Sequence, residues 1–211
     1  MALVSNKSTF LHIAKCSGMW IRHAYKLCNI PHVEVGDQHL HFPTLLRYND
    51  EEFYKSRYTF AFIRHPLTWY QSRWAFRLKN GWRSQHPLDF NCASNDFATF
   101  INNVIQYKPD GWVTWEYKSY IDQVPGGIKF IGKIENLVED TITAFREAGE
   151  EFNENVVRLI PRINDSDMDG FTSKQLAKYT PKLVDRVMAV ESEIIRRYYH
   201  NVDPYSIVDV I

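Results

Sequence analysis

The sequence predicts an α/β fold in which a central parallel sheet is flanked by helices in three layers. Short apolar segments rich in β-branched and aromatic residues alternate with segments of helical periodicity. This alternation is typical of strand–helix–strand units, whose strands run parallel. The chain has 211 residues, 45% of them hydrophobic, and no obvious linker. We therefore expect a single domain over residues 1–211.

Four segments are expected to form the strands of this sheet. The strongest is YTFAFIR at residues 58–64, and the first is TFLHIA at residues 9–14. A short apolar segment at residues 32–36 and a longer one at residues 128–134, which follows the turn PGG, complete the set.

The segments between the strands have helical periodicity and helix-end residues. Pro66 suits the first position of a helix, Asn95 is a candidate N-cap, and Gly149 suits the position after a helix end. Apolar residues at three- or four-residue spacing give the C-terminal segment one buried stripe. The expected helices are residues 18–29, 66–80, 95–107, 136–149 and about 180–200.

Charge and cysteine content exclude several classes of protein. Lys plus Arg equals Asp plus Glu, 25 against 25, so no overall basic field favours nucleic acid. The three cysteines are too few and too scattered for a disulfide framework or a zinc site. Neither a signal peptide nor a membrane span is expected, and a cytoplasmic location follows as the prediction.

The loop KCSG at residues 15–18 is a candidate anion site. An apolar strand delivers Lys15 to the start of a helix, where unpaired N–H groups and the helix dipole favour an anion. This arrangement is P-loop-like. The nucleotide triphosphatase signature is absent, because the lysine precedes Gly18 and no Ser or Thr follows to hold magnesium.

A second cation, Arg64, ends the strand at residues 58–64. Ligands gather at the carboxyl ends of parallel strands, so Lys15 and Arg64 are expected to serve one ligand with two anionic groups. Ser72 follows on the next helix, roughly 140° from the stripe that begins at Leu67. It therefore does not belong to the core-facing stripe.

Two motifs give the chain a specific resemblance. HIAKCSGMW at residues 12–20 and FIRHPLTWYQSRW at residues 62–74, followed by FIGKIENLVED at residues 130–140, resemble the sulfotransferases that use 3′-phosphoadenosine 5′-phosphosulfate (PAPS). The similarity is greatest to the branch that includes carbohydrate sulfotransferases. The C-terminal segments RLIPRINDSD and YTPKLVDRVMAVESEIIRRYYHNVDP also resemble the ending of that family.

The resemblance implies a role for each matching residue. Lys15 would contact the 5′ side of PAPS near the oxygen that leaves, and Arg64 and Ser72 would hold the 3′-phosphate. No metal is expected, and the product would be 3′,5′-adenosine bisphosphate. Residues with an implied role in donor binding are Lys15, Cys16, Ser17, Gly18, Met19, Trp20, Arg64, Ser72 and Arg162, and Arg158 lies in the same nucleotide-covering segment.

The acceptor side of the expected site is less specific. The resemblance implies a histidine base after the second strand; His39 matches that spacing, and His41 is the alternative. The acceptor would be a small-molecule or glycan hydroxyl, or an amine. An aromatic cluster forms either core or an acceptor cleft: Trp112, Trp115, Tyr117 and Tyr120.

Two alternatives to a sulfotransferase stay open. The family has hydroxyl residues after the glycine where this chain has Met19 and Trp20, which is consistent with a nucleotide-binding module that has lost catalysis. A P-loop nucleotide kinase is the other alternative, although the missing GK[ST] motif disfavours it.

Overall fold

The computed structural model describes residues 2–36, 42–161, 163 and 176–210. The chain divides into two compact units, each of two segments. We call Met1–Arg64 with Tyr117–Ile163 the sheet unit, and His65–Glu116 with Asn164–Ile211 the helical unit. Three predicted site residues lie outside the described residues: His39, His41 and Arg162.

The sheet unit contains a five-stranded sheet in the order β3-β1-β2-β4-β5. Strands β2, β4 and β5 pair in parallel, whereas β1 pairs antiparallel with both β2 and β3. The sheet is therefore mixed, and the prediction of a parallel sheet is wrong at β1. The strands are β1 (Ala2–Ser5), β2 (Ser8–Leu11), β3 (His32–Val35), β4 (Tyr58–Ile63) and β5 (Phe130–Lys133).

The antiparallel strand arises from a tight hairpin that sequence patterns did not reveal. Asn6 and Lys7 connect β1 directly to β2. The Ser5 hydroxyl accepts hydrogen bonds from the backbone N–H of Ser8, at 2.8 Å, and of Lys7, at 3.0 Å. A serine that bonds the backbone ahead of it favours a turn over a continued strand. Strand β1 thus lies beside β2 and runs antiparallel to it.

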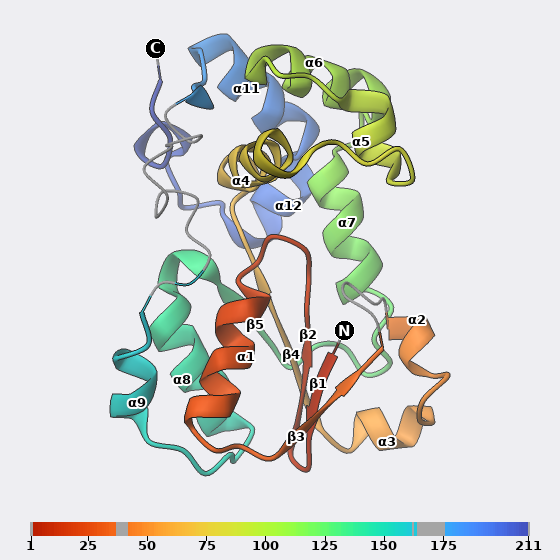
Figure 1. Cartoon of the computed structure of the whole chain (residues 1–211), viewed down its shortest axis with the longest axis vertical. Helices are drawn as coiled ribbons and strands as arrows, with labels where there is room; N and C mark the ends of the chain where they lie inside the picture. The colour runs from red at the N-terminus through yellow and green to blue at the C-terminus, as the bar shows by residue number, and fades with distance from the viewer. Residues whose placement is uncertain (1, 37–41, 162, 164–175, 211) are drawn as a thin grey trace. The chain divides into compact units, whose positions relative to one another are not determined.

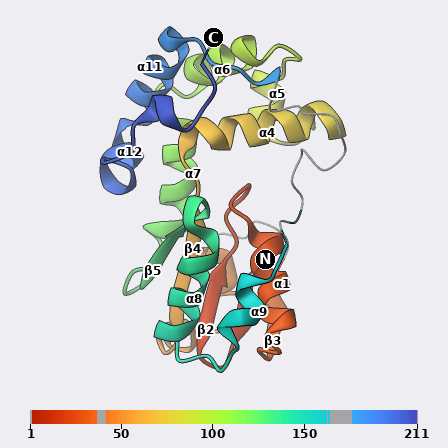
Figure 2. The same ribbon diagram turned by 90° about the vertical axis from the view of Figure 1, so that its left-hand side faces the viewer.

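Helices lie against the sheet in the sheet unit. Figures 1 and 2 show α1, α8 and α9 together on one face of the sheet, and Figure 1 shows α2 and α3 on the other side. Their bounds are α1 (Gly18–Leu27), α2 (Phe42–Leu45), α3 (Glu51–Lys55), η1 (Ile134–Asn136), α8 (Leu137–Glu147) and α9 (Glu154–Arg158). The α/β class is confirmed, with a mixed sheet flanked by helices.

Aromatic side chains form the core between the sheet and the first of these helix layers. The ring centroids of Phe10 and Phe60, on β2 and β4, lie 5.4 Å apart. Phe145 of α8 lies 6.2 Å from Phe60 and 4.9 Å from Tyr25 of α1. All four rings are buried. Alternate residues of the strands therefore hold α1 and α8 on this face.

Most predicted helices are present, with some changes at their ends. Helix α4 (Pro66–Asn80) has the predicted bounds, and Pro66 is its first residue. Helix α6 (Phe97–Tyr107) is capped by Asp96, whose carboxylate accepts from the Thr99 N–H at 2.7 Å; the Asn95 prediction is wrong by one residue. Gly149 follows α8 with a φ of 72°, as predicted.

The helical unit also contains elements that were not predicted as such. Helix α7 (Trp112–Ile121) begins in the helical unit and ends in the sheet unit. The predicted C-terminal helix over residues 180–200 is two helices that meet at the buried Glu191, α11 (Pro181–Val190) and α12 (Ser192–Tyr198). The remaining elements are α5 (Pro87–Cys92) and η2 (Pro204–Ser206). Among the helices that the structure describes, none is long and apolar enough to cross a membrane.

Candidate functional site

The loop after β2 has a backbone shaped for a close turn. Lys15 and Ser17 both have positive φ, at 63° and 59°, which non-glycine residues adopt infrequently. The Cys16 N–H donates to the Ile13 carbonyl at 3.3 Å, and the Cys16 side chain is buried. The strand therefore turns sharply before helix α1 begins at Gly18. Lys15 itself is half-buried.

The N-terminus of α1 presents donors to whatever lies in front of it. The Trp20 N–H donates to the Ser17 carbonyl at 2.9 Å, and the Ile21 N–H donates to the same carbonyl at 3.1 Å. The N–H groups of Gly18 and Met19 have no acceptor among the described residues, and the Ser17 hydroxyl does not cap the helix. Unpaired N–H groups at a helix start attract an anion.

Gly18 is required by a close neighbour. A Cβ atom at this position would lie 1.9 Å from the imidazole of His12, which is an impossible contact. The His12 ring is buried and stacks on Phe10 at 6.1 Å between centroids. The glycine therefore lets the start of α1 pack directly on the residue that follows β2. His12 has a packing role here, as its neighbours show.

Lys15 and Arg64 follow the same ends of two neighbouring strands. Strands β2 and β4 are adjacent and parallel, with Leu11 paired to Ala61. Lys15 comes four residues after Leu11, and Arg64 comes three residues after Ala61. The ends of β2 and β4 are therefore adjacent, as expected.

A tyrosine joins the two loops that carry these cations. The Tyr117 hydroxyl accepts from the Arg64 backbone N–H at 3.0 Å and donates to the Arg64 carbonyl at 2.7 Å. The same oxygen lies 3.5 Å from the Cys16 Sγ. Because its proton is given to the carbonyl, we infer that the thiol donates to the hydroxyl oxygen. Sequence reasoning placed Tyr117 only in an aromatic cluster and missed this contact, for which a one-dimensional pattern carries no signal.

A third cation lies at the same edge of the sheet and was not predicted as a site residue. Lys133 ends β5, where it is paired to Ile63 of the neighbouring parallel strand β4. Its backbone N–H donates to the Asp140 carboxylate at 2.6 Å. The sequence signal was a strand that ends in a lysine, IGK, just as β4 is followed by Arg64. Lys133 therefore adds positive charge where the parallel strands end.

Met19 and Trp20 occupy the positions where the resembling family has hydroxyl residues. Trp20 is buried, and its indole N–H donates to the Pro161 carbonyl at 3.1 Å. Met19 is exposed, and its sulfur accepts from the Arg22 guanidinium at 3.0 Å. Trp20 therefore anchors the segment after α9 to α1. Side-chain donors at this loop are left to Lys15 and Ser17.

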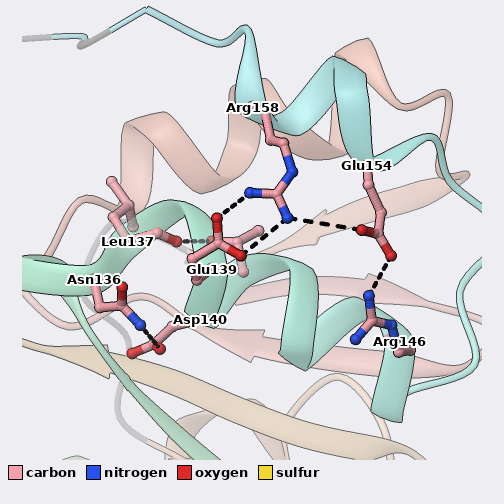
Figure 3. A network of polar contacts seen from close by, with 8 residues as sticks. Asn136, Leu137, Glu139, Asp140, Arg146, Glu154 and Arg158 are labelled. Atoms are coloured by element: carbon pink, nitrogen blue, oxygen red, sulfur yellow. Dashed lines mark hydrogen bonds and ion pairs between the residues drawn. The ribbon is translucent and has the colours of Figure 1, made fainter.

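Arg158 belongs to a surface ion-pair network (Figure 3). Its guanidinium pairs with both oxygens of Glu139, one of them at 3.0 Å, and lies 3.8 Å from Glu154. Arg146 pairs with Glu154 as well. The Arg158 hydrogen bond holds the pKa of Glu139 below its usual value. Arg158 is thus engaged in joining α9 to α8, and this placement gives no support to a nucleotide-covering role.

Ser72 lies in the helical unit, on α4, and is half-buried. Its neighbours in sequence are both engaged within that unit. The Gln71 amide donates to the Ala177 carbonyl at 2.7 Å, and Arg73 pairs with Asp89 at 2.5 Å. Helix α4 is buried over most of its surface, including Trp69. The described contacts therefore bring together the 15–20 loop and Arg64, and they assign no ligand to Ser72.

Comparison of the chain with models of protein families, with curated proteins and with solved structures finds no match. The arrangement of Lys15, Arg64 and the α1 N-terminus is therefore interpreted from its own chemistry.

Proposed function

We propose that the chain is a PAPS-dependent sulfotransferase that transfers a sulfuryl group to a hydroxyl acceptor, a carbohydrate hydroxyl being one candidate. The observation that supports this most is that two cationic residues follow the same ends of two adjacent strands. Lys15 and Arg64 follow adjacent parallel strands, and the Tyr117 hydroxyl contacts both loops. A ligand with two separated anionic groups matches such a pair.

The loop at residues 15–18 is suited to binding PAPS, although it lacks the Ser or Thr with which a P-loop holds magnesium. The unpaired N–H groups of Gly18 and Met19, together with Lys15 and the Ser17 hydroxyl, are donors suited to the 5′-phosphosulfate. Arg64 would hold the 3′-phosphate, and the resemblance implies the same role for Ser72. We infer that β2, the loop and α1 form a P-loop-like unit in which the lysine precedes the glycine.

The reaction needs positioned charge and a base. The acceptor oxygen forms a bond to sulfur, the bond between sulfur and the bridging phosphate oxygen breaks, and the leaving oxygen gains negative charge. Lys15 and the N–H groups of the loop would stabilise that charge. The acceptor proton passes to a base, for which His39 is the first candidate and His41 the second.

A nucleotide-binding module without catalysis is the second candidate. It is favoured by one observation: the side chains of Met19 and Trp20, which contact Arg22 and Pro161, supply no hydroxyl to a phosphate. This module would bind 3′,5′-adenosine bisphosphate and show no transfer to any acceptor. A nucleotide kinase would instead require ATP with magnesium.

Thermal unfolding with three ligand conditions tests the proposal. A hundredfold excess of 3′,5′-adenosine bisphosphate over its Kd should add about 2.7 kcal/mol to the free energy of unfolding, with EDTA present. ATP with magnesium should protect much less. Protection by ATP with magnesium alone would reject the sulfotransferase. The bisphosphate could protect the protein while assays with PAPS and a panel of sugars and alcohols yield no sulfated product. These two results together would favour the binding module.

A further inference from the structure

A cavity lined in part by cationic side chains lies in the sheet unit. It has a volume of about 240 Å³ and is lined by residues of α3, β4 and the turn before β5, including Lys55, Arg57 and Lys129. It adjoins the first residues of β4, whereas Arg64 follows the last residue of that strand. Six residues of strand separate the two ends, roughly 20 Å. The cavity is therefore distinct from the proposed donor site.

Arg57 is held in place before any ligand binds. Its Nε donates to the Ser5 carbonyl at 2.9 Å and its Nη1 to the Phe53 carbonyl at 2.6 Å. Its guanidinium carbon lies 3.5 Å from the centre of the Phe53 ring. Carbonyls and an aromatic ring fix the orientation of the group, but they do not neutralise its charge. Fixed donors bind an anion with a smaller loss of conformational entropy.

The three cations differ in how their charge is compensated. Lys55 pairs with Glu51 at 2.5 Å and with Glu52 at 3.3 Å, so two carboxylates already compensate its charge. Neither Arg57 nor Lys129 has a carboxylate within ion-pair distance in the part of the chain that the structure describes. Two uncompensated positive charges therefore face the cavity. They favour the binding of an anion in this cavity.

The turn at Gly126 and Gly127 forms another side of the cavity. Both glycines have a φ of 76°, which L side chains rarely adopt. A Cβ atom at either position would meet nothing within 4 Å, so the space in front of this backbone is open. A ligand can therefore approach the turn closely.

We propose that this cavity binds a tetrahedral oxyanion, a phosphate or sulfate group, between Arg57 and Lys129. Because Nε and Nη1 of Arg57 donate to protein oxygens, the Nη2 group remains to donate to oxygens of such a group. Lys129 is exposed and can move to neutralise the remaining charge. The open turn leaves room for a substituent, so the group is bound either as the inorganic ion or as part of a small molecule. This proposal does not depend on the sulfotransferase activity.

Amide NMR spectra of the full chain, titrated at constant ionic strength, test the proposal. Sodium sulfate and sodium phosphate should shift the Gly126, Gly127 and Lys129 signals in a saturable way, whereas chloride and acetate should not. Glycerol phosphate distinguishes the inorganic ion from a phosphate that is part of a small molecule. It should shift the same signals if the cavity accepts a phosphate that carries a substituent. Lys129→Gln should weaken sulfate binding about tenfold or more. Lys26→Gln, at an exposed lysine elsewhere in the sheet unit, should leave it unchanged.

A pair of variants at one position separates charge from backbone strain. Asn and Asp have the same shape and both tolerate positive φ better than other non-glycine residues. Gly127→Asn should retain sulfate binding, whereas Gly127→Asp should abolish it by adding a negative charge at the rim. Equal affinities in these two variants, equal shifts with chloride, or no effect of Lys129→Gln would each overturn the proposal. Binding of 3′,5′-adenosine bisphosphate at the Lys15 loop should be the same in all of these variants.

Discussion

Tyr117 is a single residue whose hydroxyl group contacts both loops of the proposed donor site. Its side chain is fully buried, and its oxygen makes two hydrogen bonds to the Arg64 backbone. Without that oxygen, the N–H and carbonyl of Arg64 lose these partners. The position of the residue after β4 therefore depends on a side chain that comes from α7.

Removal of this hydroxyl should loosen the end of β4. We expect Tyr117→Phe to lower the free energy of unfolding by about 1–3 kcal/mol, since two partly buried backbone groups of Arg64 lose the hydroxyl as a hydrogen-bond partner. Chemical denaturation measures the change. Tyr48→Phe, at an exposed tyrosine of the same unit, is the matched control and should change stability little. A loss no greater than that of the control would show that water replaces the Tyr117 hydroxyl.

Arg64 offers a direct test of the proposed 3′-phosphate contact. Arg64→Ala should weaken 3′,5′-adenosine bisphosphate about 10- to 100-fold, because a charge-assisted hydrogen bond contributes roughly 1.5–3 kcal/mol. Affinity for adenosine 5′-phosphosulfate, which lacks the 3′ group, should barely change. Calorimetric titration measures both. Arg47→Ala, at an exposed arginine of the same unit, is the control. Equal losses for the two nucleotides would mean that Arg64 acts on the fold and not on the 3′-phosphate.

The lowered pKa of His65 predicts that the helical unit loses stability at acid pH. Burial lowers its pKa from 6.5 to about 4. Its Nδ1 accepts from the Leu67 N–H at 3.3 Å at the start of α4, and its ring packs edge-on against Tyr199. Above pH 6.5 the ring is neutral in both states. Between pH 6.5 and 4 the unfolded chain binds a proton that the folded chain does not, so stability falls as pH falls.

The total loss from His65 should approach about 3 kcal/mol at pH 4, from 1.36 kcal/mol per unit of pKa difference. His65→Asn retains an acceptor at the N-cap and removes the titration. Urea unfolding at several pH values should therefore show a shallower decline for the variant between pH 6.5 and 4. Parallel declines for the two proteins would assign the acid sensitivity to other groups.

At the scale of elements, one carboxylate links four helices, α4, α7, α11 and α12. Glu191 is fully buried where α11 meets α12. It accepts hydrogen bonds from the Tyr70 hydroxyl of α4 at 2.5 Å and from the Val113 N–H of α7 at 3.0 Å. It also accepts from the N–H and the hydroxyl of Thr114, both at 2.7 Å. The carboxylate thus satisfies the first N–H groups of α7, and burial still raises its pKa.

Exchange of this carboxylate for an amide should be costly. Glu191→Gln keeps the shape but turns one acceptor oxygen into a donor that faces other donors. Each donor left unpaired should cost about 1–3 kcal/mol, so the helical unit should unfold at clearly lower denaturant concentration. Asp110→Asn, an exposed carboxylate of the same unit, serves as the control. Equal midpoints for the two variants would show that Glu191 does not hold the helices together.

At the scale of the whole molecule, the proposed transfer requires the donor loop and an acceptor base to act on one substrate pair. His39 and His41 lie outside the described residues, so their roles stay predictions. His39→Ala should lower kcat by 10² to 10⁴, the usual contribution of general-base catalysis, with bisphosphate binding nearly unchanged. His41→Ala should have a much smaller effect. Assays with PAPS and an acceptor that the parent protein sulfates measure both.

The pH dependence gives the same test a second readout. The parent kcat should fall below a pKa of about 6–7, where the base becomes protonated, and the His39→Ala variant should lose that decline. If His41→Ala lowers kcat more than His39→Ala does, His41 is the base. If neither substitution slows turnover, the base lies elsewhere in the chain.

Local sequence patterns determined the elements whose signals are local. Pro66 and the helical period predict the bounds of α4, and Gly149 predicts the end of α8. Apolar segments rich in β-forming residues predict the strands β2 and β4, which precede Lys15 and Arg64. The adjacency of those two strands agrees with the parallel pairing that strand–helix–strand patterns predict. These features depend on residues a few positions apart.

Only the tertiary structure decided the contacts between distant segments. The insertion of β1 depends on a turn at Ser5, the break at Glu191 on donors from α4 and α7, and the joining of the two loops on Tyr117. At Glu191 and Tyr117 a buried polar side chain must find partners far away in the chain, because an unpaired buried donor or acceptor costs free energy. The Ser5 turn is local, but only the structure shows that the strand before it pairs with both β2 and β3. The sequence contains both partners of each pair, but hydrophobic periodicity carries no information about which ones meet.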